Sequence, residues 1–467
     1  MKLYNTLTKS VDEIVPQEAG KIKMYSCGPT VYDYAHVGHW FTYVRTDMLI
    51  RALKASGLEL NWVMNITDVG HLVSDADEGE DKLEKGAKRE GKTAWEVAEF
   101  YTQDFLHEMQ SLNITTPTHI TKATDHIAEQ IALIQVLESK GYTYQIDDGI
   151  YYDTSKFSHY ADFAQLDLSE QQAGARVSFN EQKHNASDFA LWKFSPTDHK
   201  RDMEWDSPWG KGFPGWHIEC SAMSMKYLGD TLDIHTGGID HIPVHHTNEI
   251  AQSEAATGKQ FARHWMHSNH VLIDGEKISK SLGNGIRLSE LAEQGVTPAA
   301  FRVLVLESHY RSQSKFSLQA AKAAQARLKD LYAMAALRWQ PLDHPIDGAS
   351  FGYDDVPSEI AALLADDLNT PGVMAYLSNV SKEIQTVLLW HKSLPHFETL
   401  LTGIDELLGL DLQSIQDITA AQKQLIADRE TARQSKDWAT ADKLRDELLA
   451  QGIELRDTEY GVIWSYR

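Results

Sequence analysis

Cysteine is scarce in this chain: Cys27 and Cys220 are the only two among 467 residues. Two cysteines exclude a disulfide-rich scaffold. Long apolar runs are also missing, since none approaches the ~20 residues that a membrane helix needs. The N-terminal segment lacks the apolar stretch of a secretory signal. We therefore expect a cytoplasmic protein that makes no contact with a membrane.

Positive charge is scarce as well. The chain has 44 Lys and Arg against 67 Asp and Glu, a net charge of −23, which argues against a protein that coats anionic surfaces with its whole face. A local basic patch remains possible, and residues 301–340 are rich in cations while residues 341–420 are acidic. The cations of the first stretch are Arg302, Arg311, Lys315, Lys322, Arg327, Lys329 and Arg338.

The remaining composition is that of a globular protein, with 42% hydrophobic residues. At ~150 residues per domain, the length predicts about three domains. Residues 21–27 and 58–68 are typical of strands, and residues 40–55 have the apolar spacing of a helix. Strand, helix and strand in this order predict a βαβ unit and a parallel sheet.

Later segments differ in character. The charged residues 74–94 predict a solvated excursion, and residues 123–141 an amphipathic helix. Residues 142–210, rich in Tyr, Asp and Gly, predict an insertion with short strands. From about residue 316 onward the pattern is mostly helical.

The first chemical motif runs from Cys27 to His39 (CGPTVYDYAHVGH). It lies where a strand gives way to a helix, and a helix N-terminus offers backbone N–H groups to phosphate. Gly38 permits close approach of a ligand. His36 and His39 share one helical face and can donate to phosphate oxygens. Alone, this short motif is weak evidence.

The second motif is KISKS at 277–281, followed by LGN. Lysine is a compact point charge that suits a polyphosphate whose charge is moving, so Lys277 and Lys280 are candidates for a cationic clamp. The alternative is an ordinary solvated basic loop.

A third constellation could hold a metal. His245 and Glu249 are four residues apart, so a helix would place both on one side. Together with the two cysteines they form a donor set that suits Zn²⁺. Two buried free cysteines and an unrelated His/Glu pair are the alternative, which the spacing alone favours.

Taken together, these motifs resemble the class I aminoacyl-tRNA synthetases, and the words around them resemble the cysteinyl-tRNA synthetase family. The similarity extends over nearly the whole chain, in order. Its longest words are SPWGKGFPGWHIECSAMSMKYLG at 207–229, HHTNEIAQSE at 245–254, KISKSLGN at 277–284, DDLNTPGVMAYL at 366–377 and ATADKLRDELLAQGIELRDTEYGVIW at 439–464.

This resemblance implies an α/β Rossmann-type catalytic domain with an insertion, followed by a mainly α-helical bundle and a small C-terminal domain. The expected boundaries are 1–118 and 210–265 for the two halves of the catalytic domain, 119–209 for the connective insertion, 266–325 for the connecting fold with KISKS, 326–415 for the tRNA-binding bundle and 416–467 for the anticodon-binding domain.

The resemblance also implies the site. One Zn²⁺ per chain would be held by Cys27, Cys220, His245 and Glu249, with the adjacent His246 outside the ligand set. His36, Gly38, His39 and Lys280 would bind ATP, with Lys277 in support. Thr67 and Trp216 would line the cysteine pocket next to Cys27.

The implied reaction is that of a cysteine–tRNA ligase. Cysteine would be activated with ATP and Mg²⁺ to an adenylate and transferred to the 3′-terminal adenosine of tRNA-Cys, by a chain that we expect to be a monomer. A Zn²⁺ that binds the substrate sulfur would separate cysteine from serine, which a hydrophobic pocket rejects poorly. We further expect Arg311, Lys315, Lys322 and Arg327 to contact tRNA phosphates.

Two alternatives come from other classes: a ligase that joins cysteine to an amino-sugar, and a non-catalytic tRNA-binding paralogue. The first should lack the C-terminal segments, and the second should have lost a zinc ligand or a lysine. The sequence departs from the family pattern at Trp40, Phe41 and Pro243-Val244, so the resemblance does not predict the pocket geometry there.

Overall fold

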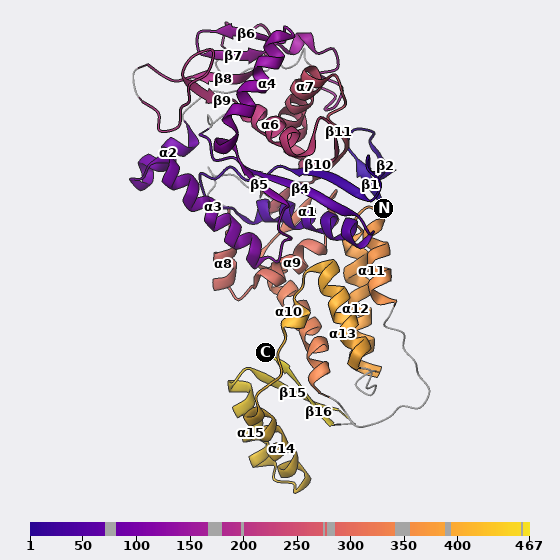
Figure 1. Cartoon of the computed structure of the whole chain (residues 1–467). Helices are drawn as coiled ribbons and strands as arrows, with labels where there is room; N and C mark the ends of the chain where they lie inside the picture. Colours follow the sequence, from indigo (N-terminus) through magenta and orange to yellow (C-terminus); the bar gives the residue numbers. More distant parts are fainter. Residues whose placement is uncertain are drawn as a thin grey trace.

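The computed structural model describes residues 1–70, 81–166, 180–197, 200–273, 276–277, 285–340, 355–387, 394–458 and 461–467. The described chain is elongated, with a sheet-containing half, a helical region below it and a small terminal unit (Figure 1). No helix of the described residues combines the length and apolar character needed to cross a bilayer.

A parallel sheet of order β11-β10-β3-β4-β5 forms the centre of the first half. Its strands are β3 (Lys21–Ser26), β4 (Glu59–Ile66), β5 (His119–Lys122), β10 (Leu232–Gly238) and β11 (Ala262–Ser268). An antiparallel hairpin, β1 (Lys2–Asn5) and β2 (Ser10–Glu13), joins it through β1. The predicted strand–helix–strand unit is confirmed: α1 (Val37–Ala55) connects β3 to β4, which pair in parallel.

Helices cover both faces of this sheet. Figure 1 shows α4 (Ile127–Ser139), α6 (Trp216–Leu228) and α7 (Thr247–Thr257) on one face and α1 on the other. The links α2 (Lys82–Glu90) and α3 (Ala94–Ser111) lead from β4 toward β5. Part of the predicted charged excursion is thus the helix α2. The short helices here are η1 (Ala123–His126), η3 (Ile239–His241) and η4 (Ile242–His246).

The insertion contains an antiparallel sheet of order β6-β7-β8-β9. Its strands are β6 (Thr143–Ile146), β7 (Gly149–Tyr152), β8 (Phe189–Phe194) and β9 (Gly212–Pro214), with η2 (Thr154–Lys156) after β7. The short strands predicted for residues 142–210 are therefore present, and the sheet extends slightly beyond that range.

A second small sheet, of order β13-β12-β14, follows the catalytic sheet. It consists of β12 (Val271–Ile273), β13 (Glu276–Lys277) and β14 (Ser314–Phe316). The helical region contains α8 (Leu288–Glu293), α9 (Pro298–Leu306), α10 (Leu318–Ala336), η5 (Leu337–Trp339), α11 (Val356–Ala365), α12 (Thr370–Val387), α13 (Leu394–Leu408) and η7 (Leu412–Ser414).

The C-terminal unit pairs two helices with a hairpin. It is made of α14 (Ala420–Gln434), α15 (Trp438–Ala450), β15 (Ile453–Thr458) and β16 (Gly461–Tyr466). Its apolar cluster includes Leu448, Ile453 and Trp464 and reaches Ala336 at the end of α10. The mostly helical pattern predicted after residue 316 is confirmed.

A buried charge cluster joins the sheet to the helical region. Arg302 on α9 and Arg51 on α1 both pair with the Asp47 carboxylate, which is fully buried. Arg302 also donates to the Leu408 carbonyl at 2.5 Å, and Arg51 donates to the Asp405 carbonyl at 3.0 Å. The end of α13 is thereby attached to α1.

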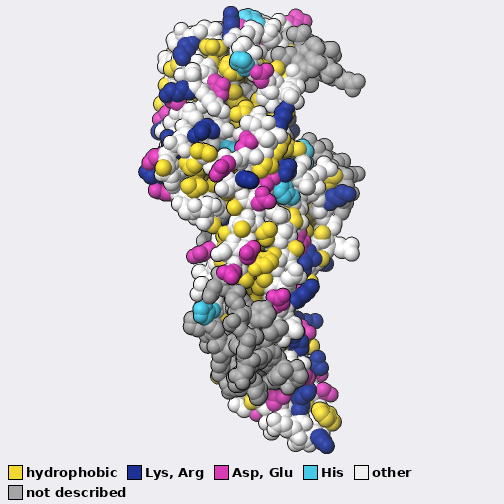
Figure 2. Space-filling model, turned by 90° about the vertical axis from the view of Figure 1, so that its right-hand side faces the viewer, with side chains coloured by type: hydrophobic (Ala, Val, Ile, Leu, Met, Phe, Trp, Pro, Cys, Tyr) yellow, Lys and Arg dark blue, Asp and Glu magenta, His cyan; other side chains and the backbone are white. Residues whose placement is uncertain are grey.

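This cluster corrects the expectation that residues 301–340 form one RNA-facing cationic surface. Arg302 is fully buried and Arg338 is nearly so. Of the four residues expected at phosphates, Arg311 pairs with Asp367 and Arg327 pairs with Glu307. Exposed lysines remain at 315, 322 and 329. On the face in Figure 2, cations and anions are interspersed rather than gathered by sign.

Candidate active site and metal centre

A pocket of about 410 Å³ opens at the carboxyl ends of the parallel strands. The chain proceeds from β3 to β4 in one direction and reaches β10 on the other side of β3, so the strand order reverses there. Ligands of open α/β sheets bind at such a switch point. Cys27 directly follows β3, and Gly237, Asp240 and His241 stand at the end of β10.

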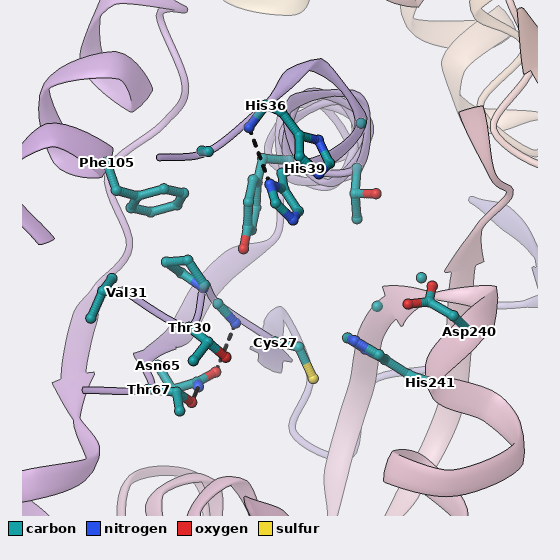
Figure 3. A pocket seen from close by; sticks show the side chains of 18 of the residues that line it. Cys27, Thr30, Val31, His36, His39, Asn65, Thr67, Phe105, Asp240 and His241 are labelled. Atoms are coloured by element: carbon teal, nitrogen blue, oxygen red, sulfur yellow. Dashed lines mark hydrogen bonds between the residues drawn. The ribbon is translucent and has the colours of Figure 1, made fainter. Parts of the chain in front are cut away.

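The HVGH motif forms one wall of this pocket. The structure places His36 at the N-cap of α1, so the helix starts earlier than the predicted residue 40. The His36 backbone N–H donates to His39 Nδ1 at 3.2 Å, and the two rings stack with centroids 3.7 Å apart (Figure 3). Because Nδ1 of His39 accepts, its neutral ring carries the proton on Nε2, which can donate to an anion. Gly38 also lines the pocket.

The chain that follows KISKS returns to this helix start. The Val37 backbone N–H donates to the Ile286 carbonyl at 2.8 Å. A Cβ placed on Gly285 would lie 3.3 Å from His36 Cδ2. Lys277 belongs to β13, where it pairs with Leu272; its side chain and all of Lys280 lie outside the described residues. The clamp role of both lysines stays a prediction.

Four predicted metal donors lie together at the pocket floor. The ligand atoms of Cys27, Cys220 and His245 are within 4.8 Å of one another. His245 Nε2 is 3.6 Å from Glu249 Oε2, and both residues are fully or almost fully buried. Cys27 and Glu249 also belong to a second overlapping group with His235 and His246. The structure thus brings all four predicted donors into one cluster.

Glu249 shows whether these residues suit a cation. His235 Nε2 lies 3.2 Å from Glu249 Oε1, a hydrogen-bonding distance, whereas Oε2 is buried without a hydrogen-bond partner among the described residues. A buried carboxylate oxygen without a partner is costly unless a cation completes it. Burial also raises the pKa of Cys27 well above its usual value, and a bound metal would reverse this preference for the thiol. The donor set fits zinc.

His246 has contacts of its own. Its Nε2 is 3.3 Å from Cys27 Sγ, and its Nδ1 is 2.7 Å from Nε2 of His267. Thr6 Oγ1 in turn lies 2.7 Å from His267 Nδ1. His245 instead has His217 at its Nδ1, 3.0 Å away. Both histidines extend from η4, a π-helical turn, and such turns are frequent at functional sites.

Thr67 belongs to a chain of hydrogen bonds beneath the pocket. The Gly28 backbone N–H donates to Asn65 Oδ1 at 2.7 Å, and Asn65 Nδ2 donates to Thr67 Oγ1 at 3.0 Å. The Thr67 hydroxyl donates to Glu219 Oε2 at 3.2 Å. Because Glu219 precedes Cys220 on α6, this chain connects both cysteine-bearing segments. A Cβ on Gly28 would lie 1.6 Å from the Asn65 carbonyl oxygen, so only glycine fits there.

The other expected pocket residue, Trp216, stands at the first turn of α6. Its ring centroid is 4.4 Å from that of His245, and it lines the pocket. The sequence reasoning missed Asn65, Glu219, Asp240 and His241. For Asp240, a signal existed in the polar GGID turn directly after a strand-like segment.

The departures from the family pattern lie away from the pocket. Trp40 is fully buried and stacks on Phe105, with its Nε1 donating to Glu108 at 2.8 Å. Phe41 packs edge-to-face on Phe301. Both residues therefore serve the contacts of α1 with its neighbouring helices. Pro243 and Val244 lie within η4.

Comparison with known proteins agrees with this geometry. Residues 13–326 match the family of class I (C) tRNA synthetase catalytic domains, and residues 416–464 match the cysteinyl-tRNA ligase anticodon-binding domain. The cysteine–tRNA ligase 1 of Burkholderia lata is 46% identical, covering 99% of this chain and 96% of the relative. That of Treponema denticola is 41% identical, covering 99% of each.

Solved structures support the fold. A methionyl-tRNA synthetase of Mycobacterium tuberculosis, in complex with methionyl-adenylate, is similar with a TM-score of 0.59 at 15% identity, covering 85% of this chain and 93% of that one. The LeuRS of Agrobacterium radiobacter K84 gives 0.59 at 11% identity, covering 86% of each. Matches to both family domains and to full-length relatives at this identity are decisive: the chain belongs to the cysteine–tRNA ligase family of class I aminoacyl-tRNA synthetases.

Proposed function

We propose that this protein activates L-cysteine with ATP and transfers it to the 3′-terminal adenosine of tRNA-Cys, and that it selects cysteine by zinc. The observation that carries the selection is the cluster of Cys27, Cys220, His245 and Glu249 at the floor of the pocket. A zinc ion bound there would take the substrate thiolate as a further ligand, and serine offers no comparable soft donor.

The surrounding residues hold these donors in place. His217 faces His245 and His235 faces Glu249, so each donor is oriented by a buried neighbour. Such outer partners fix the tautomer and direction of a ligand. Trp216 stacks beside His245 and forms a flat wall against which a small side chain can pack. The hydrogen-bond chain through Thr67 keeps the polar side of the pocket rigid.

The start of α1 supplies the phosphate-binding part. The free N–H groups and dipole of a helix N-terminus attract anions, and His36 and His39 add ring donors beside Gly38. Lys280, supported by Lys277, would stabilise the departing pyrophosphate, with Mg²⁺ neutralising ATP. Attack of the cysteine carboxylate on the α-phosphorus needs positioning and charge stabilisation, so no side chain has to act as nucleophile.

Asp240 gives the pocket an anionic side chain opposite these cationic groups. It is exposed at the end of β10, on the same side as His241 (Figure 3). An exposed carboxylate accepts hydrogen bonds from hydroxyl groups. We assign it to the ribose hydroxyls of the bound nucleotide.

Cysteine-dependent ATP–pyrophosphate exchange, with serine as the control, tests the first step. We expect exchange with cysteine and at least a hundredfold less with serine, and charging of tRNA-Cys on addition of the RNA. Exchange with equal efficiency for the two amino acids would refute zinc-based selection.

The alternatives predict other results. A cysteine:amino-sugar ligase would consume an amino-sugar and leave tRNA uncharged, but the match of residues 416–464 to an anticodon-binding domain disfavours it. A non-catalytic paralogue would show no exchange, yet all four zinc donors are present. We expect a cytoplasmic monomer, which sedimentation of the purified protein can check.

A further inference from the structure

The rim of the pocket next to α2 has an unusual surface. α2 packs directly on the loop that follows Cys27: a Cβ on Gly86 would lie 3.5 Å from the Tyr32 carbonyl oxygen. Arg89 NH2 approaches the Tyr101 hydroxyl at 3.4 Å, and Tyr101 lines the pocket. Figure 1 shows α2 projecting from the side of the catalytic sheet, beside the start of α3.

The outer side of this helix is cationic. Lys85, Lys88, Arg89 and Lys92 are all exposed. The nearby acids are mostly engaged elsewhere. Asp81 is buried against Arg201, to which Glu84 also turns at 4.0 Å.

Glu90 is the acid that faces these cations. It is shared between Arg89 at 3.0 Å and Lys92 at 3.2 Å. One carboxylate therefore stands against four cations at this surface, in a chain whose net charge is −23.

An aromatic platform adjoins these cations. Phe100 on α3 is 43% exposed. Its ring meets Tyr101 edge-to-face at 5.1 Å and Tyr34 at 6.1 Å, and Tyr34 lines the pocket. Lys92 Nζ lies 4.6 Å from the Phe100 centroid. The platform thus extends from the outer surface to the pocket mouth.

We propose that Lys85, Lys88, Lys92 and Phe100 form the surface that guides the single-stranded 3′ end of tRNA into the pocket. The inference rests on the proposed function and deepens it. Single-stranded nucleic acids bind where cations follow the phosphates and aromatic rings stack on bases, and unstacked RNA ends are recognised in this way. ATP and cysteine occupy the interior, so these outer residues act at transfer.

Two variants separate the parts of this surface: Phe100→Ala, and a triple variant with alanine at Lys85, Lys88 and Lys92. The matched controls are Phe100→Leu and a triple variant with alanine at Lys54, Lys156 and Lys259, which are exposed elsewhere. Each protein is tested for cysteine-dependent exchange, for single-turnover transfer, and for binding of intact tRNA and of tRNA without its 3′ CCA.

We expect exchange within twofold of wild type in every variant. Wild type should bind intact tRNA more tightly than truncated tRNA, and Phe100→Ala should remove most of that difference, a loss of roughly 5- to 150-fold, as expected for one base–ring stack. Transfer should slow in parallel. The triple variant should weaken binding of intact tRNA and reduce its salt dependence, whereas its control should not.

Equal binding of intact and truncated tRNA by wild type, or equal losses for both RNAs in Phe100→Ala, would overturn this inference while exchange continued. A parallel fall of exchange in Phe100→Ala would overturn it as well, by placing the ring in the activation step. Absence of cysteine-dependent exchange in wild type would instead overturn the proposed function and this inference with it.

Discussion

Asp47 and Arg302 form an ion pair in which both side chains are fully buried. Burial alone raises the pKa of Asp47, but Arg302 and Arg51 outweigh it and lower the pKa to about 2. A carboxyl whose folded pKa is depressed stabilises the fold above its ordinary pKa near 4, and this contribution, ~2 kcal/mol, is lost as the pH falls toward 2.

Asp47→Asn should therefore cost ~3–5 kcal/mol of unfolding free energy at pH 7, because Arg302 would remain buried without its counter-charge. Urea denaturation measures this cost. Asp230→Asn removes an exposed partner of Lys259 and should cost less than about 1 kcal/mol. Equal effects of the two substitutions would show that the buried pair is not the joint between α1 and α9.

Glu108 predicts the opposite dependence on pH. Burial, with help from Asp104, raises its pKa to about 7. The folded state then holds this proton more tightly than the unfolded chain, so stability should fall as the pH rises from about 4.5 to 7. Glu108→Gln keeps an acceptor for Trp40 and should remove this decline, seen in urea midpoints at pH 5 and pH 8. Glu138→Gln, which alters an exposed acceptor of Trp209, should leave the decline unchanged.

The zinc ligands can be separated by neighbouring histidines. Elemental analysis should find one Zn²⁺ per chain in wild type and in His246→Ala, and much less in His245→Ala. Retention of zinc by His245→Ala and its loss from His246→Ala would move the ion into the group of Cys27, His235, His246 and Glu249. Cys220→Ser should raise the KM for cysteine far more than that for ATP, since the metal holds the amino acid alone.

Lys280→Ala should slow adenylate formation by roughly 10²–10³, the usual effect of removing one charge-stabilising group. Single-turnover measurement of adenylate and of charged tRNA separates the two steps. Normal adenylation combined with slow transfer would contradict the role assigned to this lysine.

The helical region carries its own electrostatic prediction. Lys315, Lys322 and Lys329 are exposed and make no ion pair among the described residues, so their joint replacement by alanine should lower tRNA affinity and flatten its salt dependence by somewhat under one per contact. Replacing the paired Arg311 and Arg327 should change the slope less. If the arginine variant has the larger effect, the ion pairs with Asp367 and Glu307 must open on binding.

Sequence patterns predicted the elements whose burial is periodic. The unit from β3 to β4 follows from alternating and helical apolar spacing, both of which depend on neighbours in the chain. The start of α1 at Val37 escaped this reading because a histidine side chain, not a usual Ser or Asp, bonds the backbone at the cap. The boundaries proposed for the domains stay predictions.

The site was predictable only where motifs could be matched to a family. Cys27, Cys220 and His245 come from three segments, and no local spacing reveals that their side chains meet. Asn65 and Glu219 act behind the pocket, through hydrogen bonds that the sequence does not record. Arg302 was misjudged because cations were counted without their context: it stands alone in the apolar run FRVLVL, which signals a buried and paired charge.

The two cysteines give the protein a built-in gauge of its own active site. Both thiols of the chain line the same pocket, so every covalent modification by a thiol reagent is a reaction at that pocket. Counting the modified sulfur atoms in the intact protein by mass spectrometry therefore measures what fraction of molecules has a filled site, without mutation or an added label. A purification batch can be graded in this way before any kinetic assay.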